Sequence, residues 1–210
     1  MVFMITRQQL KVFNLFRNGI LKEWTFKGIK KALKESSNNK LQTSLKHFEK
    51  EGLIKLKRVG KTNLYSLNLK NNKTFEYLSI CFLEFCPNNI PIEVLYKVQE
   101  AVIKTTDLFS LLVFGSFSKG EATKNSDIDV AVIVENEETK KQIVPSLESV
   151  RRRELTDIHC NVFTNDEFLE MLLIEQENVG KEIFRNHFIF YNPISFYKMV
   201  MKGVEHGFRG

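Results

Sequence analysis

Apolar residues recur at helical spacing in three segments of the first seventy residues. They lie on one side of residues 7–17, 26–34 and 40–51, and in the last segment they recur at i, i+4 and i+7. Such stripes predict amphipathic helices with one buried face. The turn at 36–39 offers Ser and Asn side chains as N-caps for the third helix, and Gly52 stands where a left-handed C-cap belongs.

The pattern then changes to alternation. Between residues 54 and 68, apolar and polar positions alternate on both sides of a basic turn at Gly60, which predicts a β-hairpin. Helical spacing returns until Pro87 and Pro91 interrupt it. The elements predicted after residue 70 are a helix within 71–90, a helix over 92–105, strands over 108–114 and 155–164 with another opening at 126–129, and helices with one short strand from 166 to 210.

The order of these elements predicts an α+β chain. Its 210 residues, 43% of them hydrophobic, are enough for one large or two small domains with real cores. We expect a domain at 1–70, a helical connector at 71–90 and a domain at 91–210. In the second domain a mixed β-sheet is flanked by helices and followed by C-terminal helices.

The charge distribution supports two domains with different partners. The whole chain carries a net charge of +6, but residues 1–70 hold 16 Lys and Arg against 4 Asp and Glu, a net +12. Residues 71–210 hold 15 basic and 21 acidic side chains, a net −6. An asymmetry of this size predicts that the first domain faces a polyanion and that the second does not need to.

The layout of the basic domain points to DNA. A helix, a short helix, a turn, a basic helix and a basic hairpin follow one another, and residues 5–70 resemble the winged helix-turn-helix regulators of prokaryotes, most clearly from Leu45 to Asn68. The resemblance implies double-stranded DNA as the partner, with the third helix in the major groove and the hairpin at the backbone. The candidate DNA-binding residues are Lys40, Gln42, Thr43, Lys46, His47, Lys57, Arg58 and Lys61.

Two other interpretations of this domain stay open. A lysine-rich helix can be only a solvated face, and some winged helices bind protein. The lysines of the hairpin would neutralise phosphates, whereas Gln42, Thr43 and His47 would reach base edges.

The acidic half contains the chain's most informative motif. An apolar strand runs into Gly115-Ser116, and Ser126-Asp127-Ile128-Asp129 opens a second strand. Asp127 and Asp129 point to the same face, because side chains alternate along a strand. Two adjacent carboxylates favour a divalent cation, with Mg²⁺ preferred by oxygen ligands, and Gly115-Ser116 offers backbone N–H groups and a hydroxyl to a phosphate. The alternative is a purely structural role, in which the aspartates cap a turn.

This arrangement resembles the nucleotidyltransferase superfamily that includes DNA polymerase β, and especially its minimal members. The matching pattern is Gly115-Ser116-x3-Gly120-x5-Ser126-Asp127-x-Asp129. The resemblance implies the nucleotidyltransferase fold, with Asp127 and Asp129 as metal ligands and catalytic residues. Gly115, Ser116 and Ser126 would bind a nucleoside triphosphate, ATP in the first instance. In such members the acceptor is often a protein, including the toxin partner of a toxin–antitoxin pair.

The family uses a third carboxylate on a neighbouring strand, and two residues of the predicted strand at 155–164 compete for that position. Asp157 and His159 share a face. The residue type favours Asp157, whereas counting back from the end of the strand favours His159. We expect Asp157 to be the third metal ligand and catalytic residue. Arg151–Arg153 could meet a triphosphate, although a solvated helix end also explains them.

These features support three functions. The chain is a Mg²⁺-dependent nucleotidyltransferase with a DNA-binding domain, or a transcription regulator whose transferase-like domain senses nucleotide or holds a dimer together, or an enzyme that modifies nucleic acid held by the winged helix. The role of Asp157 distinguishes the first two functions. An intact set of three carboxylates with Asp157 favours catalysis, and a broken set favours sensing. The aromatic residues predict a core or a homodimer interface.

The remaining expectations concern location. Three cysteines cannot all pair with one another, the first residues carry no charged leader before an apolar stretch, and no apolar run approaches the ~18 residues of a membrane span. We therefore expect a cytoplasmic protein with no membrane partner.

Overall fold

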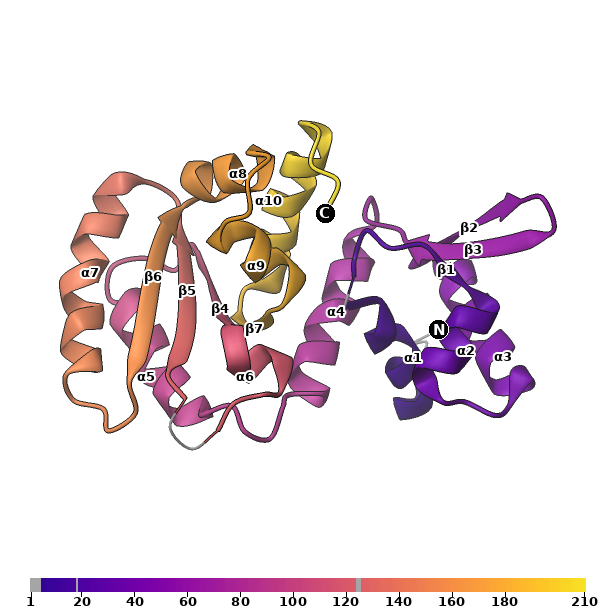
Figure 1. Ribbon diagram of the computed structural model, residues 1–210, viewed down its shortest axis with the longest axis horizontal. Helices are drawn as coiled ribbons and strands as arrows, with labels where there is room; N and C mark the ends of the chain where they lie inside the picture. The colour runs from indigo at the N-terminus through magenta and orange to yellow at the C-terminus, as the bar shows by residue number, and fades with distance from the viewer. Residues whose placement is uncertain (1–4, 18, 124–125) are drawn as a thin grey trace. The chain divides into compact units, whose positions relative to one another are not determined.

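A computed structural model describes residues 5–17, 19–123 and 126–210 (Figure 1). The first four residues, where no leader was expected, and residues 124–125 of the motif loop lie outside the described residues. The chain divides into two compact units, Met1–Phe85 and Cys86–Gly210. Helices and strands occur in both, so the predicted α+β class is confirmed.

The first unit begins and ends with a helix, and its strands form one antiparallel sheet in the order β1-β3-β2. Strands β2 and β3 form the predicted hairpin around Gly60. The elements of this unit are α1 (Arg7–Arg17), β1 (Trp24–Thr25), α2 (Phe26–Leu33), α3 (Asn38–Lys50), β2 (Ile54–Val59), β3 (Thr62–Leu67) and α4 (Asn72–Glu84).

Helix α3 begins and ends where the sequence predicts. The side chain of Ser37 accepts a hydrogen bond from the backbone N–H of Lys40, which is an N-cap. Gly52 has a φ of +68°, in the left-handed region that favours glycine, and the next N–H, from Leu53, donates to Phe48 O at 2.8 Å. The buried Phe48 ring meets Phe13 of α1 edge-on, with 5.2 Å between centroids. The apolar stripes of α1 and α3 therefore form one core.

Most of residues 71–90, the segment expected to be a connector, belongs to the first unit. Helix α4 packs against α1, and Thr74 Oγ1 donates to the carbonyl oxygens of Asn68 (2.9 Å) and Leu53 (3.3 Å). Arg7 of α1 also pairs with Glu84 of α4 at 2.7 Å. These contacts extend the first unit to Phe85, because the apolar face of α4 completes a core that the sequence pattern assigned to residues 1–70 alone.

The second unit contains a mixed sheet in the order β6-β5-β4-β7. Strands β5 and β6 are parallel, and the β4–β5 and β4–β7 pairs are antiparallel. Its elements are α5 (Ile92–Ile103), β4 (Phe109–Phe114), α6 (Gly115–Lys119), β5 (Ile128–Val134), α7 (Glu137–Arg151), β6 (Ile158–Thr164), α8 (Asn165–Leu173), α9 (Val179–Arg185), β7 (Phe188–Tyr191) and α10 (Pro193–Glu205).

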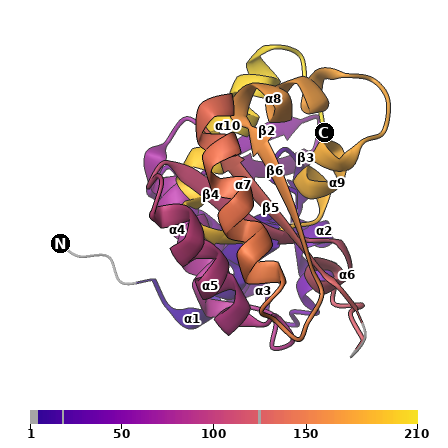
Figure 2. The same ribbon diagram turned by 90° about the vertical axis from the view of Figure 1, so that its left-hand side faces the viewer.

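Helices flank this sheet. Helices α5 and α7 run side by side along it (Figure 2), and α8, α9 and α10 form the other helical layer. Strand β4 is buried throughout, as are the positions of β5 from Val130 to Val134. Polar side chains are therefore confined to the ends of these central strands, which is where the motif lies. Among the described helices, none is both long and apolar enough to cross a membrane.

Candidate functional site

The Gly-Ser and Asp-x-Asp segments meet at one end of the β4–β5 pair. Phe114 and Asp129 are direct partners in the antiparallel register, and Gly115 follows at once as the first residue of α6. The sequence predicted both strands, and their antiparallel pairing brings the end of one beside the start of the other.

Gly115 is the tightest point of this junction. Its φ is +65°, and a Cβ at this position would lie 2.2 Å from Asp129 Oδ2. Only glycine satisfies both the left-handed backbone and the close approach of the carboxylate. Ser116 is half-buried next to it. The third predicted nucleotide-binding residue, Ser126, accepts a hydrogen bond at its Oγ from Thr123 N at 2.9 Å.

The residue brought to the two aspartates by β6 is His159. Asp129 and His159 are partners in the parallel register of β5 and β6. His159 Nδ1 lies 3.7 Å from Asp129 Oδ1, and His159 Nε2 lies 3.8 Å from Asp127 Oδ2. One imidazole ring thus faces both carboxylates, one nitrogen toward each.

The register pairs Asp129 with His159 and leaves Asp157 one position before the Ile128–Ile158 pair, so the role of Asp157 as third ligand stays a prediction. Asp157 precedes β6, its side chain is exposed, and its carbonyl oxygen accepts a hydrogen bond from Ile128 N at 2.9 Å. Within the described part of the chain, no group of three or more His, Cys, Asp or Glu side chains is placed to hold a metal ion.

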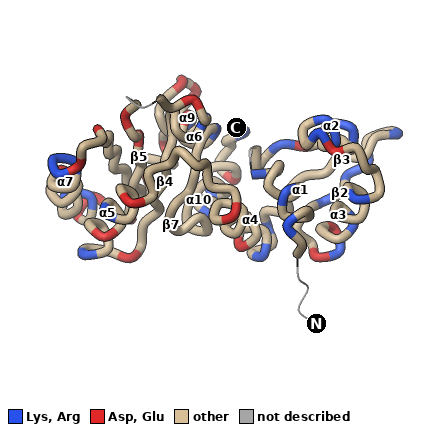
Figure 3. Tube along the Cα trace, turned by 90° about the horizontal axis from the view of Figure 1, so that it is seen from below, with Lys and Arg blue, Asp and Glu red and all other residues tan. Residues whose placement is uncertain are grey.

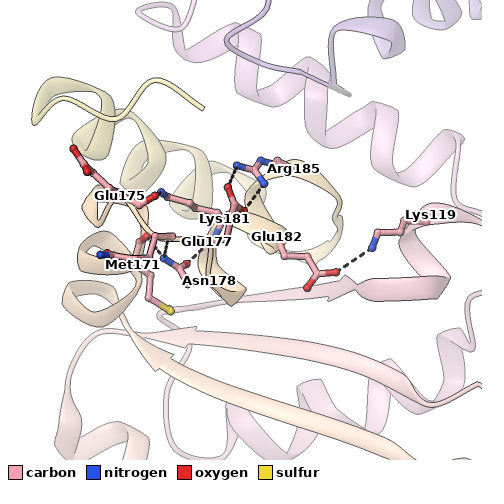
Figure 4. Close-up of polar contacts among 9 residues, drawn as sticks. Lys119, Met171, Glu175, Glu177, Asn178, Lys181, Glu182 and Arg185 are labelled. Atoms are coloured by element: carbon pink, nitrogen blue, oxygen red, sulfur yellow. Dashed lines mark hydrogen bonds and ion pairs between the residues drawn. The ribbon is translucent and has the colours of Figure 1, made fainter.

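The electrostatics around Asp129 involve more than the motif. Burial raises the pKa of the Asp129 carboxyl above its ordinary value, His159 lowers it, and the carboxylates of Asp127 and Glu182 raise it further. Glu182 lies on α9 and pairs with Lys119, the last residue of α6, with 3.0 Å between Oε1 and Nζ (Figure 4). Neither residue of this pair was predicted from the sequence. A base four residues after Gly115 could have indicated Lys119, but nothing local indicates Glu182.

The two aspartates fit one divalent cation. Their carboxylates are partly exposed, lie on one face and are flanked by the Gly115 turn. Mg²⁺ is commonly held in proteins by one or two carboxylates, with phosphate and water oxygens completing the octahedron. Asp127 and Asp129 therefore suffice for one such ion, whereas a second ion would need a carboxylate at the position of His159.

The first unit carries a second candidate site, a groove of about 470 Å³ between helices α2 and α3 and the β2–β3 hairpin. Two predicted DNA-binding residues, Gln42 and Lys61, line it. The other lining residues, which the sequence analysis missed, are Thr25, Phe26, Lys27, Asn38, Thr62, Asn63 and Tyr65. Lys and Arg gather on α2, α3 and this hairpin (Figure 3).

The remaining predicted DNA-binding residues differ in exposure. Most are exposed on α3 or the hairpin; these are Lys40, Thr43, Lys46, Lys57 and Arg58. His47 is half-buried, and its ring lies edge-on to Phe48 with 6.0 Å between centroids and its Nε2 buried. Its position on α3 therefore turns His47 toward the core more than toward a ligand.

Comparison with known proteins concerns the second unit. The sequence model described as "Nucleotidyltransferase domain" matches residues 95–205, slightly more than half of the chain. The match spans the elements from α5 to α10, including the Gly115 turn and both aspartates. Among curated proteins, none matches the chain significantly.

Proposed function

The chain belongs to the nucleotidyltransferase domain family, and on that premise we propose that its second unit binds a nucleoside triphosphate with Mg²⁺ and transfers the nucleotidyl group to an acceptor hydroxyl. ATP is the nucleotide to test first, and a protein is the acceptor that the resemblance favours. The observation that carries the proposal is the contact between Gly115 and Asp129, which puts a glycine turn directly against a carboxylate.

Each part of the site has a role in this reaction. The backbone at Gly115 and the Ser116 hydroxyl bind phosphate oxygens, and Lys119 at the end of the same helix adds a positive charge. Asp127 and Asp129 would hold the metal ion, and Mg²⁺ would supply positive charge that offsets the charge of the phosphate groups. The acceptor oxygen bonds to the α-phosphorus, its proton passes to water, and the bond to the bridging oxygen breaks so that pyrophosphate leaves.

Transfer of label tests this proposal. The full-length protein is incubated with Mg²⁺ and each α-labelled nucleoside triphosphate, with the protein itself and a lysate of its host as acceptors. We expect label from one nucleotide to become acid-stable on an acceptor. Asp127→Asn and Asp129→Asn should each abolish it. Label that appears equally with either variant would exclude the proposed site.

His159 favours a second candidate function, nucleotide binding without transfer. A histidine opposite Asp129 gives no charge to balance a second Mg²⁺, and two-metal catalysis depends on that charge. In this case the unit is a nucleotide sensor or a dimerisation module of a regulator. Binding of ATP with no incorporation of label in any fraction would decide for the sensor.

We propose that the first unit is a winged helix that binds double-stranded DNA. The order α1, β1, α2, α3, β2, β3, the net charge of +12 over residues 1–70 and the groove beside Gln42 and Lys61 support this assignment. A homodimer and a cytoplasmic location belong to the same proposal. Loss of DNA binding in full-length variants of the groove tests this assignment.

A further inference from the structure

Helix α9 is held in a fixed position on α8. Asn178 caps α9 by accepting a hydrogen bond from Lys181 N, and its amide Nδ2 donates to Met171 O at 2.8 Å. A Cβ at Gly180 would lie 2.6 Å from Met171 Cβ, so the first turn of α9 packs closely against α8 (Figure 4). Side chains that leave α9 therefore start from a well-defined backbone.

The charged side chains of α9 go to different places. Lys181 Nζ donates to Glu175 O at 2.8 Å, and Arg185 pairs with both carboxylate oxygens of Glu177 at 2.6 and 2.8 Å. Both contacts tie α9 to the segment that joins it to α8. Glu182 instead reaches Lys119, which is 63 residues away in the sequence (Figure 4).

Lys119 of this long-range pair lies on the same short helix as the proposed phosphate site. Lys119 ends the five-residue helix whose first residue, Gly115, touches the Asp129 carboxylate. Both side chains are partly exposed, 34% for Lys119 and 44% for Glu182, so a ligand in solution can reach them. The carboxylate of Glu182 is also among the charges that raise the pKa of Asp129, which places it within electrostatic range of the aspartates.

We propose that Glu182 is a built-in competitor of the nucleotide: it occupies Lys119 in the free protein, and phosphate groups must displace it to bind. The inference rests on the proposed nucleotide binding. Displacement needs only a rotation of the Glu182 side chain, because α9 itself is anchored. The Glu182–Lys119 contact thereby lowers the affinity of the site for nucleotide. It also keeps Lys119 paired until a polyanion binds.

A structural brace between α6 and α9 is the competing explanation, and the sign of one substitution separates the two. If Glu182 only braces the site, Glu182→Gln weakens nucleotide binding and lowers the melting temperature. If Glu182 competes, the same substitution tightens nucleotide binding, because phosphate no longer has to displace a carboxylate from Lys119. A half-exposed ion pair of this kind corresponds to a change of roughly two- to fivefold in Kd.

The experiment is a calorimetric titration of full-length protein with ATP in excess Mg²⁺ at low salt. Glu182→Gln should bind roughly two- to fivefold more tightly than wild type. The matched control is Glu177→Gln, which breaks an ion pair on the same segment away from the aspartates and should leave Kd unchanged. An unchanged or weaker Kd for Glu182→Gln, or an equal gain for Glu177→Gln, would overturn the inference.

A double-mutant cycle adds a second readout, because a general effect on folding would not make the effect of one substitution depend on the other. Lys119→Gln should weaken binding, and adding Glu182→Gln to it should then have almost no effect, because no lysine is left to compete for. An equal gain in both backgrounds would also overturn the inference. If wild type binds no nucleotide under any condition, the proposed function itself is wrong; if wild type binds and Glu182→Gln gives no gain, only the competitor is wrong.

Discussion

Asp129 and His159 are partners across the parallel strands β5 and β6, with 3.7 Å between Asp129 Oδ1 and His159 Nδ1. The same ring lies 3.8 Å from Asp127 Oδ2 through its other nitrogen. A basic side chain thus stands where a third acidic ligand would complete a two-metal site. Under the proposed function, this relationship limits the number of metal ions at the site, and the transferase and sensor proposals differ on that number.

Replacing His159 with an acid should strengthen metal binding. His159→Asp adds a carboxylate beside Asp129, and one more unit charge a few ångströms from a divalent ion is worth on the order of 1–4 kcal/mol near a surface. We expect Mn²⁺, followed by electron paramagnetic resonance, to bind on the order of tenfold more tightly. Asp157→Asn is the control and should change nothing. A loss of Mn²⁺ affinity in His159→Asp would show that the histidine itself is a ligand.

A methyl group at Gly115 should disrupt the site. Gly115→Ala places a Cβ 2.2 Å from Asp129 Oδ2 on a backbone with φ of +65°. We expect a loss of about 1–3 kcal/mol in the free energy of unfolding, together with loss of ATP binding. Gly120→Ala is matched, since its φ is +74° but nothing lies within 4 Å of its Cβ. Gly120→Ala should lose stability through backbone strain alone and retain ATP binding. Equal losses of ATP binding in both variants would contradict the steric argument.

The pair formed by Lys140 and Glu167 should make stability depend on pH in the acid range. Burial opposes ionisation of Glu167, but hydrogen bonds from Lys140 and Thr164 outweigh it, so the net pKa lies below its ordinary 4.5. A lowered pKa means that the stabilisation is complete above the unfolded value and disappears as pH falls through the folded one. Glu167→Gln should therefore cost about 1 kcal/mol at pH 7.

Urea unfolding of Glu167→Gln and wild type, at neutral pH and below the folded pKa of Glu167, checks this dependence. The two proteins should differ at neutral pH and converge in acid, because wild-type Glu167 is then protonated as well. Glu170→Gln, on the same helix, is the control and should track wild type. A difference between Glu167→Gln and wild type that is as large in acid as at neutral pH would mean that packing, not ionisation, is responsible.

Substitutions in the groove of the first unit should distinguish contacts to phosphates from contacts to bases. Lys61→Ala should weaken binding to all DNA sequences alike and lower the slope of log K against log salt by about one. Gln42→Ala should leave that slope unchanged and reduce discrimination between sites. Lys31, exposed on α2 but not part of the groove, is the control for charge. Equal effects of Lys31→Ala and Lys61→Ala in electrophoretic mobility shifts would show that DNA is attracted by overall positive charge and not bound in the groove.

The sequence predicted the local elements well because their signals are local. The stripes of α1 and α3, the Ser37 cap and the Gly52 turn all depend on residues within a few positions of one another. The Gly115–Asp129 contact was also predictable in outline, since a strand, a turn and a second strand determine it. These features follow from periodicity and from the backbone needs of particular residues.

Features that depend on distant pairing could not be predicted in the same way. Whether Asp157 or His159 lies beside Asp129 depends on the register of β6, because the two residues share a face and a shift of two positions would exchange them. Helix α4 joins the first unit through tertiary contacts that no local pattern encodes. The ion pair of Lys119 and Glu182 joins helices 63 residues apart.

Nucleotide binding at Asp127 and Asp129 is common to the transferase and the sensor, so its dependence on Mg²⁺ is the most direct measurement. The account predicts that full-length protein binds ATP in Mg²⁺, that a chelator greatly weakens this binding, and that Asp127→Asn/Asp129→Asn removes the effect of Mg²⁺ while the fold is kept. ATP binding by the double variant that is as tight as wild type and still strengthened by Mg²⁺ would contradict it.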